Sequence, residues 1–563
     1  MPSFSASQDL SNDIYFILLT VKAPLHAQSL VFFQPWSPMK RKRAKSSNPS
    51  RVTVIPQNPL NHNNNIALPS STSQPMLSTQ SARGCNTLPR RSAILSSSQS
   101  QSGMISLTQQ VGAIKLDTHK SETFEKNDLV LDNSGNVLSG SLDALIRRLV
   151  PTKDFCPDSS YIFSLLVNIR TFISPHELMQ KIVQYCMFAQ NADSHNFAKE
   201  GRGRMFAHIL RLCSEWATNI PYDFKSEYMR TRLNELLRLC AVDKSYQQKT
   251  TDLQSSLRSS LNKLDRYEKA VSNLQKALSE NIQLPEQSDI MTGLYPLCSD
   301  AKVIAQQLTH IEMERFSMVG VDEIVQSLAS DPLSEIGRNQ KNKEGTISSI
   351  SFYIEWFNRL SAFAAIEVLR QTKKRHRIIV FEFMIDIAKE CCEIGNFNSM
   401  MAIVAGLSLP AVSRLKKTWS RVEKSKLEIL QHQLDPSGNF LSYRATIKAA
   451  QWRADGAGAN QQRIVIPFFV LLLKDLFLIY HGNSRILPNG HLNFMAFFQL
   501  AEQLRDVIQW KSTSCNFEKN PQVLQYLLIT SVSGEKDSML MSFECEPPES
   551  SAEREQHKKL KTK

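Results

Sequence analysis

Apolar residues recur at intervals of three and four along most of the chain after residue 138, which is the spacing of one helical face. The clearest stripes lie within 142–149, 161–183, 205–216, 228–239, 301–316, 347–369 and 377–394. Up to residue 239, no stretch alternates apolar and polar residues as a half-buried strand would. The pattern therefore predicts an all-α fold.

Particular residues mark where several of these helices begin and end. Ser174 is followed by Pro175 and, three residues after the cap, by Glu177, which is the signature of a helix start. A long amphipathic stretch covers 253–282 and ends at Pro285. It either packs against the helices before it or pairs with another chain as a short coiled coil. We favour the first, because its heptads are few and impure.

These patterns divide the chain into five parts. Residues 1–135 are predicted to be disordered, because 46–110 are rich in Ser, Gln, Asn and Pro and lack a sustained period. A helical module at 136–250, a connecting helix at 251–298 and a larger helical block at 299–545 follow, and the polar tail 546–563 is also predicted to be disordered. The basic cluster at 40–45 fits a nuclear signal or, more simply, a solvated charge run.

The larger block contains two consecutive helical stretches joined by a glycine-containing loop. Asn439–Ala450 begins after Pro436 and Gly438, and Phe440, Tyr443 and Ile447 share one of its faces. The chain turns near two glycines at 456 and 458 and returns as a strongly apolar stretch at 464–480. This order predicts an αα-hairpin.

Composition narrows the possible chemistry of the 563-residue chain. A net charge of +13 suits an acidic partner such as nucleic acid, anionic lipid or an acidic protein, although the excess is dispersed. The ten cysteines form no CxxC pair, which favours reduced thiols in a cytosolic protein. No metal-ligand spacing and no phosphate-cradling glycine loop occurs, so we expect no metal and no cofactor. We also expect no membrane span, since Ile14–Val21 is too short and charged residues interrupt Ile464–Tyr480.

Two sets of segments resemble the Ras-type guanine-nucleotide exchange factors. Residues 140–151, 161–183 and 216–224 resemble their N-terminal accessory module. The segments that resemble their catalytic domain follow in the family's order, at 305–316, 351–369 with 375–407, 413–419, and 435–450 with 464–483. The resemblance is strongest to the small subfamily that carries only these two domains.

This resemblance implies a helical accessory module that braces a larger helical catalytic domain with a protruding αα-hairpin. The implied activity is guanine-nucleotide exchange on a Ras-family small GTPase, Rap or Ras, without covalent chemistry and without nucleic acid. A cytoplasmic protein is implied, with recruitment to membranes through partners. In the family the hairpin is a wedge that opens the nucleotide site of the GTPase.

Three groups of residues take roles by this resemblance. The wedge would use Phe440, Tyr443, Arg444 and Ile447. The second switch of the GTPase would meet Arg414, Leu415 and Lys416. The base of the hairpin would be supported by Asn396, Asn398, Pro467 and Phe468.

Two departures from the family pattern leave alternatives open. The loop Trp452–Arg463 differs from the shorter, proline-containing turns of the family, and no acidic residue lies between Asn439 and Arg453. The wedge aromatics could instead be buried, and the chain could be a helical scaffold that has lost exchange. A GTPase-activating protein would need an exposed loop arginine, for which only Arg202 and Arg204 are candidates.

Overall fold

The computed structural model describes residues 128–152, 154–192, 199–279, 293–329 and 348–562. The first helical block comprises β1 (Leu129–Leu131), β2 (Val137–Gly140), α3 (Leu142–Leu149), α4 (Ser159–Ile169), α5 (Pro175–Ala192), α6 (Lys199–Asn219), η1 (Pro221–Lys225), α7 (Glu227–Ala241) and α8 (Lys244–Ser279). The basic cluster at 40–45 and most of the predicted N-terminal disorder lie outside the described residues.

The second block is also helical, and the all-α prediction is confirmed. Its elements before the hairpin are α9 (Leu294–Leu297), α10 (Ala301–Met318), α11 (Val321–Ala329), α13 (Ser349–Leu369), α14 (Lys374–Ile394), α15 (Phe397–Leu407), α16 (Pro410–Ser413), α17 (Lys416–Trp419) and α18 (Ser425–Gln433). The hairpin and the elements after it are α19 (Leu441–Gly456), η2 (Asn460–Arg463), α20 (Phe469–Gly482), β3 (Leu492–Asn493), α21 (Phe494–Ser512), α22 (Pro521–Ile529), α23 (Glu535–Cys545) and α24 (Ser551–Thr562).

Local capping explains where several helices start. The Ser174 backbone N–H donates to the Glu177 carboxylate (3.1 Å), and the Glu177 N–H donates to the Ser174 hydroxyl (3.2 Å). This reciprocal pair satisfies two donors at the start of α5, as the sequence predicted. Asp300 caps α10 in a similar way, because its carboxylate accepts from the Lys302 N–H at 2.9 Å.

A small antiparallel sheet in the order β1-β2-β3 was not predicted. The strand β1 lies within 1–135, so the boundary of the predicted disorder was wrong at its end. Ser139 and Gly140 of β2 pair with Asn493 and Leu492 of β3, which joins the first block to the second. Strands of two to four residues are too short for an alternating pattern to be recognised in the sequence.

Helix α4 fastens the first block to α21 of the second. The ring of Tyr161 stacks on Phe494 with their centroids 4.8 Å apart. The Asn168 amide donates to the Phe497 carbonyl (3.1 Å) and accepts from the Arg485 guanidinium (2.7 Å). Burial lowers the pKa of Arg485 to about 10, so this side chain stays cationic at neutral pH. The two blocks therefore meet through both apolar and charged contacts.

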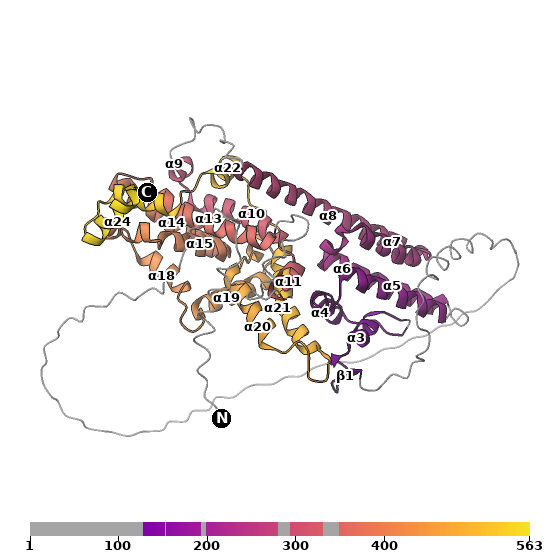
Figure 1. The fold of residues 1–563 in the computed structure, drawn as a ribbon. Helices are drawn as coiled ribbons and strands as arrows, with labels where there is room; N and C mark the ends of the chain where they lie inside the picture. Colours follow the sequence, from indigo (N-terminus) through magenta and orange to yellow (C-terminus); the bar gives the residue numbers. More distant parts are fainter. Residues whose placement is uncertain (1–127, 153, 193–198, 280–292, 330–347, 563) are drawn as a thin grey trace, which may run out of the picture. The chain divides into compact units, whose positions relative to one another are not determined.

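The predicted amphipathic helix is α8, which runs beside α7 (Figure 1). Leu253 and Leu257 are buried against the first block. Near its other end, the Tyr267 ring lies edge-on to Phe352 of α13, with centroids 6.2 Å apart. The helix thus packs within its own chain, which is the interpretation that the sequence favoured.

The C-terminal segment differs from its prediction as a disordered tail, because 551–562 form α24. Glu553 pairs with Arg414 at 3.3 Å, and the His557 ring lies 4.7 Å from that of Phe543. The segment carries few apolar residues, so its sequence shows no helical stripe. Its order depends instead on contacts with residues far away in the sequence.

Candidate functional site

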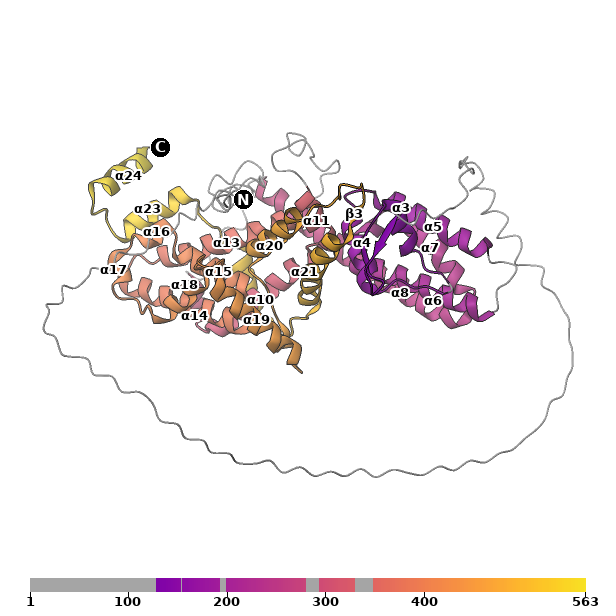
Figure 2. The same ribbon diagram turned by 90° about the horizontal axis from the view of Figure 1, so that it is seen from below.

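The predicted αα-hairpin is formed by α19 and α20, drawn in orange in Figure 2. Its base rests on the turn between α14 and α15. The Phe397 N–H donates to the Ile466 carbonyl (3.0 Å), and the Ile466 N–H donates to the Gly395 carbonyl (2.9 Å). Gly395 has φ 97°, and a Cβ atom there would lie 2.3 Å from the Ile464 carbonyl oxygen. Only glycine fits this close approach of two backbones.

Two buried asparagines support this base. The Asn396 side chain caps α15 by accepting from the Ser399 N–H (3.0 Å) and donates to the Thr309 hydroxyl (3.2 Å). The Asn398 side chain accepts from the Phe469 N–H at the start of α20 (3.2 Å). Asn398 therefore bonds directly to the backbone of α20, whereas the Asn396 side chain orders the start of α15 and links it to α10.

A fully buried carboxylate, Glu312 of α10, lies beneath the hairpin base. It accepts hydrogen bonds from the Tyr353 hydroxyl (2.6 Å), the Trp356 indole (3.0 Å), the Ser399 hydroxyl (2.9 Å) and the Asn398 amide (3.1 Å). Burial raises the pKa of Glu312, and these four bonds act in the opposite direction. Glu312 was not among the residues predicted from the sequence, although an acid on the apolar side of the 301–316 stripe was an available signal.

Tyr443 points into the domain rather than outward. Its side chain is buried, and its hydroxyl accepts from the Phe468 N–H at 2.8 Å. Its ring lies edge-on to Phe397 and to Phe468. Pro467 is buried beside it. Tyr443 is therefore one of the hairpin aromatics that are buried, which was the alternative to its role as a contact residue.

Arg444 links the two limbs of the hairpin. Its guanidinium makes two bonds of 2.7 Å with the two carboxylate oxygens of Asp475 in α20, and its Nε donates to the Asn439 carbonyl (2.7 Å). Asn439 and Phe440 both adopt the left-handed backbone region, with φ of 58° and 61°. This conformation is unfavourable for bulky residues and needs support from its surroundings. Arg444 supplies such support at the start of α19.

The outward face of α19 carries a different set of side chains. Leu441 and Trp452 are 69% and 67% exposed, and the exposed Ala445 and Lys448 lie between them at helical spacing. The Lys448 ammonium lies 5.3 Å from the centre of the Trp452 ring. Sequence reasoning assigned the neighbouring face, on which Phe440 and Ile447 are half-buried. Periodicity groups residues by face but does not say which face is covered.

The turn at 414–416 presents only one of its three predicted contact residues. Leu415 is fully buried. The Arg414 side chain is 10% exposed and donates to the Ser542 and Glu546 carbonyls at 2.9 Å each. Lys416 is exposed. The structure thus turns Arg414 and Leu415 inward, toward the C-terminal segment.

The two arginines considered for a GTPase-activating protein lie within the span of α6 and not on a loop. Their placement on a helix removes the exposed loop arginine on which that alternative depended.

Among the described residues, no group of three or more His, Cys, Asp or Glu side chains could hold a metal ion. In the same part of the chain, no helix combines the length and apolar character that a membrane crossing requires.

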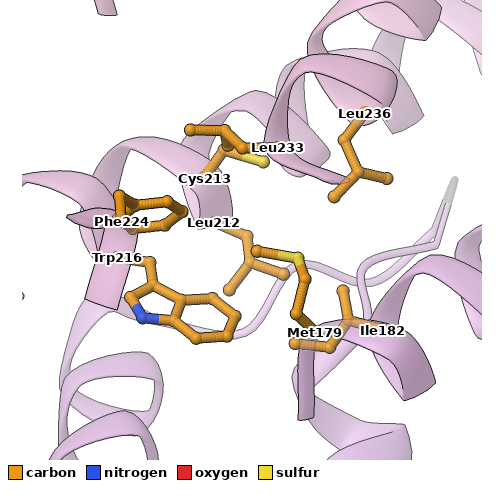
Figure 3. Close-up of a pocket in the computed structure, with 8 residues that line it drawn as sticks. All are labelled: Met179, Ile182, Leu212, Cys213, Trp216, Phe224, Leu233 and Leu236. Carbon is orange, nitrogen blue, oxygen red and sulfur yellow. The ribbon is translucent and has the colours of Figure 1, made fainter. Parts of the chain in front are cut away.

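A small cavity lies in the first block, away from the hairpin (Figure 3). It is lined by Met179, Ile182, Leu212, Cys213, Trp216, Phe224, Leu233 and Leu236. Its volume is about 10 Å³ and its lining is apolar. A bound water needs roughly 10–15 Å³ and two to four polar partners. The cavity is therefore a packing gap and not a site for a substrate or cofactor.

Comparison with known proteins agrees with this architecture. Residues 303–498 match the model of the RasGEF domain, and residues 136–236 match that of the RasGEF N-terminal motif. Ras-GEF domain-containing family member 1B of Homo sapiens is 38% identical over 435 residues, which cover 76% of this chain and 92% of the relative. Family member 1C of Mus musculus is 38% identical over 447 residues, which cover 79% of this chain and 94% of the relative.

Replacing Gly395 by alanine tests the support of the hairpin base. We expect Gly395→Ala to lower the free energy of unfolding by more than about 1 kcal/mol, because the new Cβ would clash and φ is unfavourable. The matched control is Gly456→Ala at the end of α19, where no atom lies within 4 Å of the added Cβ. Urea unfolding measures both. A Gly395→Ala protein as stable as the control would contradict this account of the base.

Proposed function

The chain belongs to the family of proteins that carry a RasGEF domain with a RasGEF N-terminal motif, and we propose that it accelerates GDP release from a small GTPase of the Ras or Rap type. The main support for this proposal is the hairpin. Its base is fixed by Gly395 and Asn398, and its helix α19 has an exposed face. The hairpin opens the switch loops of the GTPase, and GTP then loads.

The proposed mechanism uses binding energy and no covalent step. A GTPase holds GDP through Mg²⁺ and phosphate contacts, with its switch loops ordered around them. A protein that binds the open switches must weaken nucleotide binding, and the nucleotide weakens its binding by the same factor. An acceleration of about 10⁵ corresponds to a barrier lowered by about 7 kcal/mol. An inserted helix can supply this only if its mounting is rigid, because a mobile helix would lose conformational entropy on insertion.

On α19, one set of side chains would contact the GTPase and another set would hold the helix in place. Leu441, Lys448 and Trp452 are exposed and would contact the GTPase. Tyr443 and Arg444 would hold the helix in place from its other side, through Phe468 and Asp475. The half-buried Phe440 and Ile447 lie between these two groups and contribute to both the packing and the edge of the contact surface.

At the second switch, we propose a direct contact for Lys416, which is exposed. Arg414 and Leu415 would position this turn from within, because both side chains face the domain.

We also infer a cytoplasmic location for the protein, because the nine cysteines among the described residues are all free thiols.

A scaffold that binds a GTPase without exchange activity is the second candidate. One observation favours it: no acidic residue occurs on α19 before Asp455. The outward face of the helix therefore offers no carboxylate that could displace the phosphate or the Mg²⁺ of the bound nucleotide. An exchange assay separates the two candidates.

The outward face of α19 is tested by Leu441→Ala and Trp452→Ala. We expect each to slow GDP release at least about tenfold, because we propose that both are hot spots, and truncating a hot-spot residue costs about 2 kcal/mol or more. Release of a fluorescent GDP analogue from Ras and Rap measures this. Val242→Ala, which alters an exposed apolar residue of the first block, is the matched control. If both α19 variants release GDP at the original rate, the GTPase contacts another surface of the chain.

The role of Arg444 is tested by reversing its ion pair. Arg444→Glu places two carboxylates together and should abolish most exchange, while the double variant Arg444→Glu with Asp475→Arg restores the pair. Recovery of the GDP-release rate in the double variant is expected, because the proposed role is to position α19. If the double variant stays inactive although its thermal unfolding matches that of the original chain, the Asp475 pair is not sufficient, and Arg444 acts through its bond to the Asn439 carbonyl or through the GTPase itself.

A further inference from the structure

Three segments that are far apart in the sequence meet around one buried ion pair, Arg377 and Glu546. Both side chains are buried, and their charged groups are 3.6 Å apart. Arg377 also donates to the Thr418 hydroxyl (2.9 Å) and to the carbonyls of Gln371 (2.8 Å) and Thr372 (3.0 Å). The segments 371–377, 414–426 and 545–562 are thereby held as one unit.

Glu546 completes this unit from the C-terminal side. Its carboxylate accepts from the backbone N–H groups of Lys417 (3.0 Å) and Thr418 (2.8 Å), which begin the short helix α17. The elements that bear the three segments, α14, α17 and α24, are labelled in Figure 2. Glu546 therefore helps to fix the turn with Lys416 and Lys417 and, through Arg377, the turn with Lys373 and Lys374. The buried Arg377 balances the negative charge of Glu546.

The outside of the unit is strongly positive. The three segments contain 14 lysine and arginine residues and five acidic ones, so cations dominate even if every acid is paired. Four of the acids are engaged with cations of the same segments, namely Glu546, Glu549, Glu553 and Glu555. The exposed cations outside the proposed GTPase contact include Lys373, Lys374, Arg375, Arg421 and Lys424, which we name the basic surface.

The cations at the start of α14 have no acidic side chain in their own helical turn, although Asp386, further along α14, pairs with Lys426. Cations at a helix N-terminus oppose the helix macrodipole and lower stability slightly. Lys373, Lys374 and Arg375 are therefore placed where folding alone disfavours them, and this favours a role in binding.

The composition of this surface points to the kind of partner. Specific protein interfaces are enriched in aromatic residues and depleted of lysine, and single-stranded nucleic acids are bound by stacking on exposed rings. Here lysine dominates, and Trp419 is half-buried against Phe381. Clustered lysine and arginine side chains suffice to attract anionic lipid head groups. We propose that the basic surface binds the anionic face of a lipid bilayer.

Vesicle binding by the full chain tests this proposal. The chain should bind phosphatidylcholine vesicles that contain phosphatidylserine, and not vesicles of phosphatidylcholine alone. Neutralising Lys373→Gln, Lys374→Gln and Arg375→Gln together should weaken binding about a hundredfold at low salt, or about fivefold for each cation. Added salt should weaken the binding of the original chain, since exposed charges are screened.

The matched control removes three exposed cations elsewhere, by Lys244→Gln, Arg258→Gln and Lys302→Gln. It should bind vesicles like the original chain, and the cluster at 40–45 stays identical in every protein. Equal binding by the two triple variants, or no preference for phosphatidylserine, would overturn the proposal. So would a chain that ignores vesicles but binds polyglutamate or duplex DNA through the basic surface. Exchange on a GTPase in solution should be unchanged, so this test is independent of the proposed function.

Discussion

The buried carboxylate of Glu312 is the contact on which the position of the hairpin depends. It gathers donors from α13 and α15, and through Asn398 it reaches the first backbone N–H of α20. Removing a carboxylate from water is costly, and the cost is offset only when its oxygens are fully hydrogen-bonded. Because the donors come from two different helices, α13 and α15, all four bonds to the carboxylate form only when these helices are correctly placed relative to α10. The hairpin is therefore mounted on a buried and fully hydrogen-bonded part of the domain.

The outward helix of the hairpin depends on contacts behind it. Tyr443 and Arg444 face its partner helix and its base, while Leu441 and Trp452 face away. A helix held in this way has little freedom to lose when it inserts into another protein, so more of its contact energy remains for binding. The first block adds to this rigidity through α4, which packs on α21.

Periodicity and turn residues were enough to predict most of the helices up to α14, the capping of α5 and the hairpin, but not the helices α21, α22 and α23. They did not predict the sheet, since its strands are too short to show a pattern. They also missed α24, which has a polar sequence and is held by the contacts of Glu553 and His557. Residue roles were harder still. A stripe shows which residues share a face, but Tyr443 and Arg414 turned inward because of partners more than twenty positions away.

The proposed exchange activity requires the chain to bind a GTPase whose switch loops are open. This requirement is tested by comparing the affinity of the full chain for a Ras-family GTPase in the nucleotide-free state and in the GDP-loaded state. We expect the chain to bind the nucleotide-free form more than about tenfold more tightly, since chain and nucleotide must weaken each other's binding equally. The complex should also dissociate when GDP and Mg²⁺ are added. Equal affinity for the two states would contradict the account.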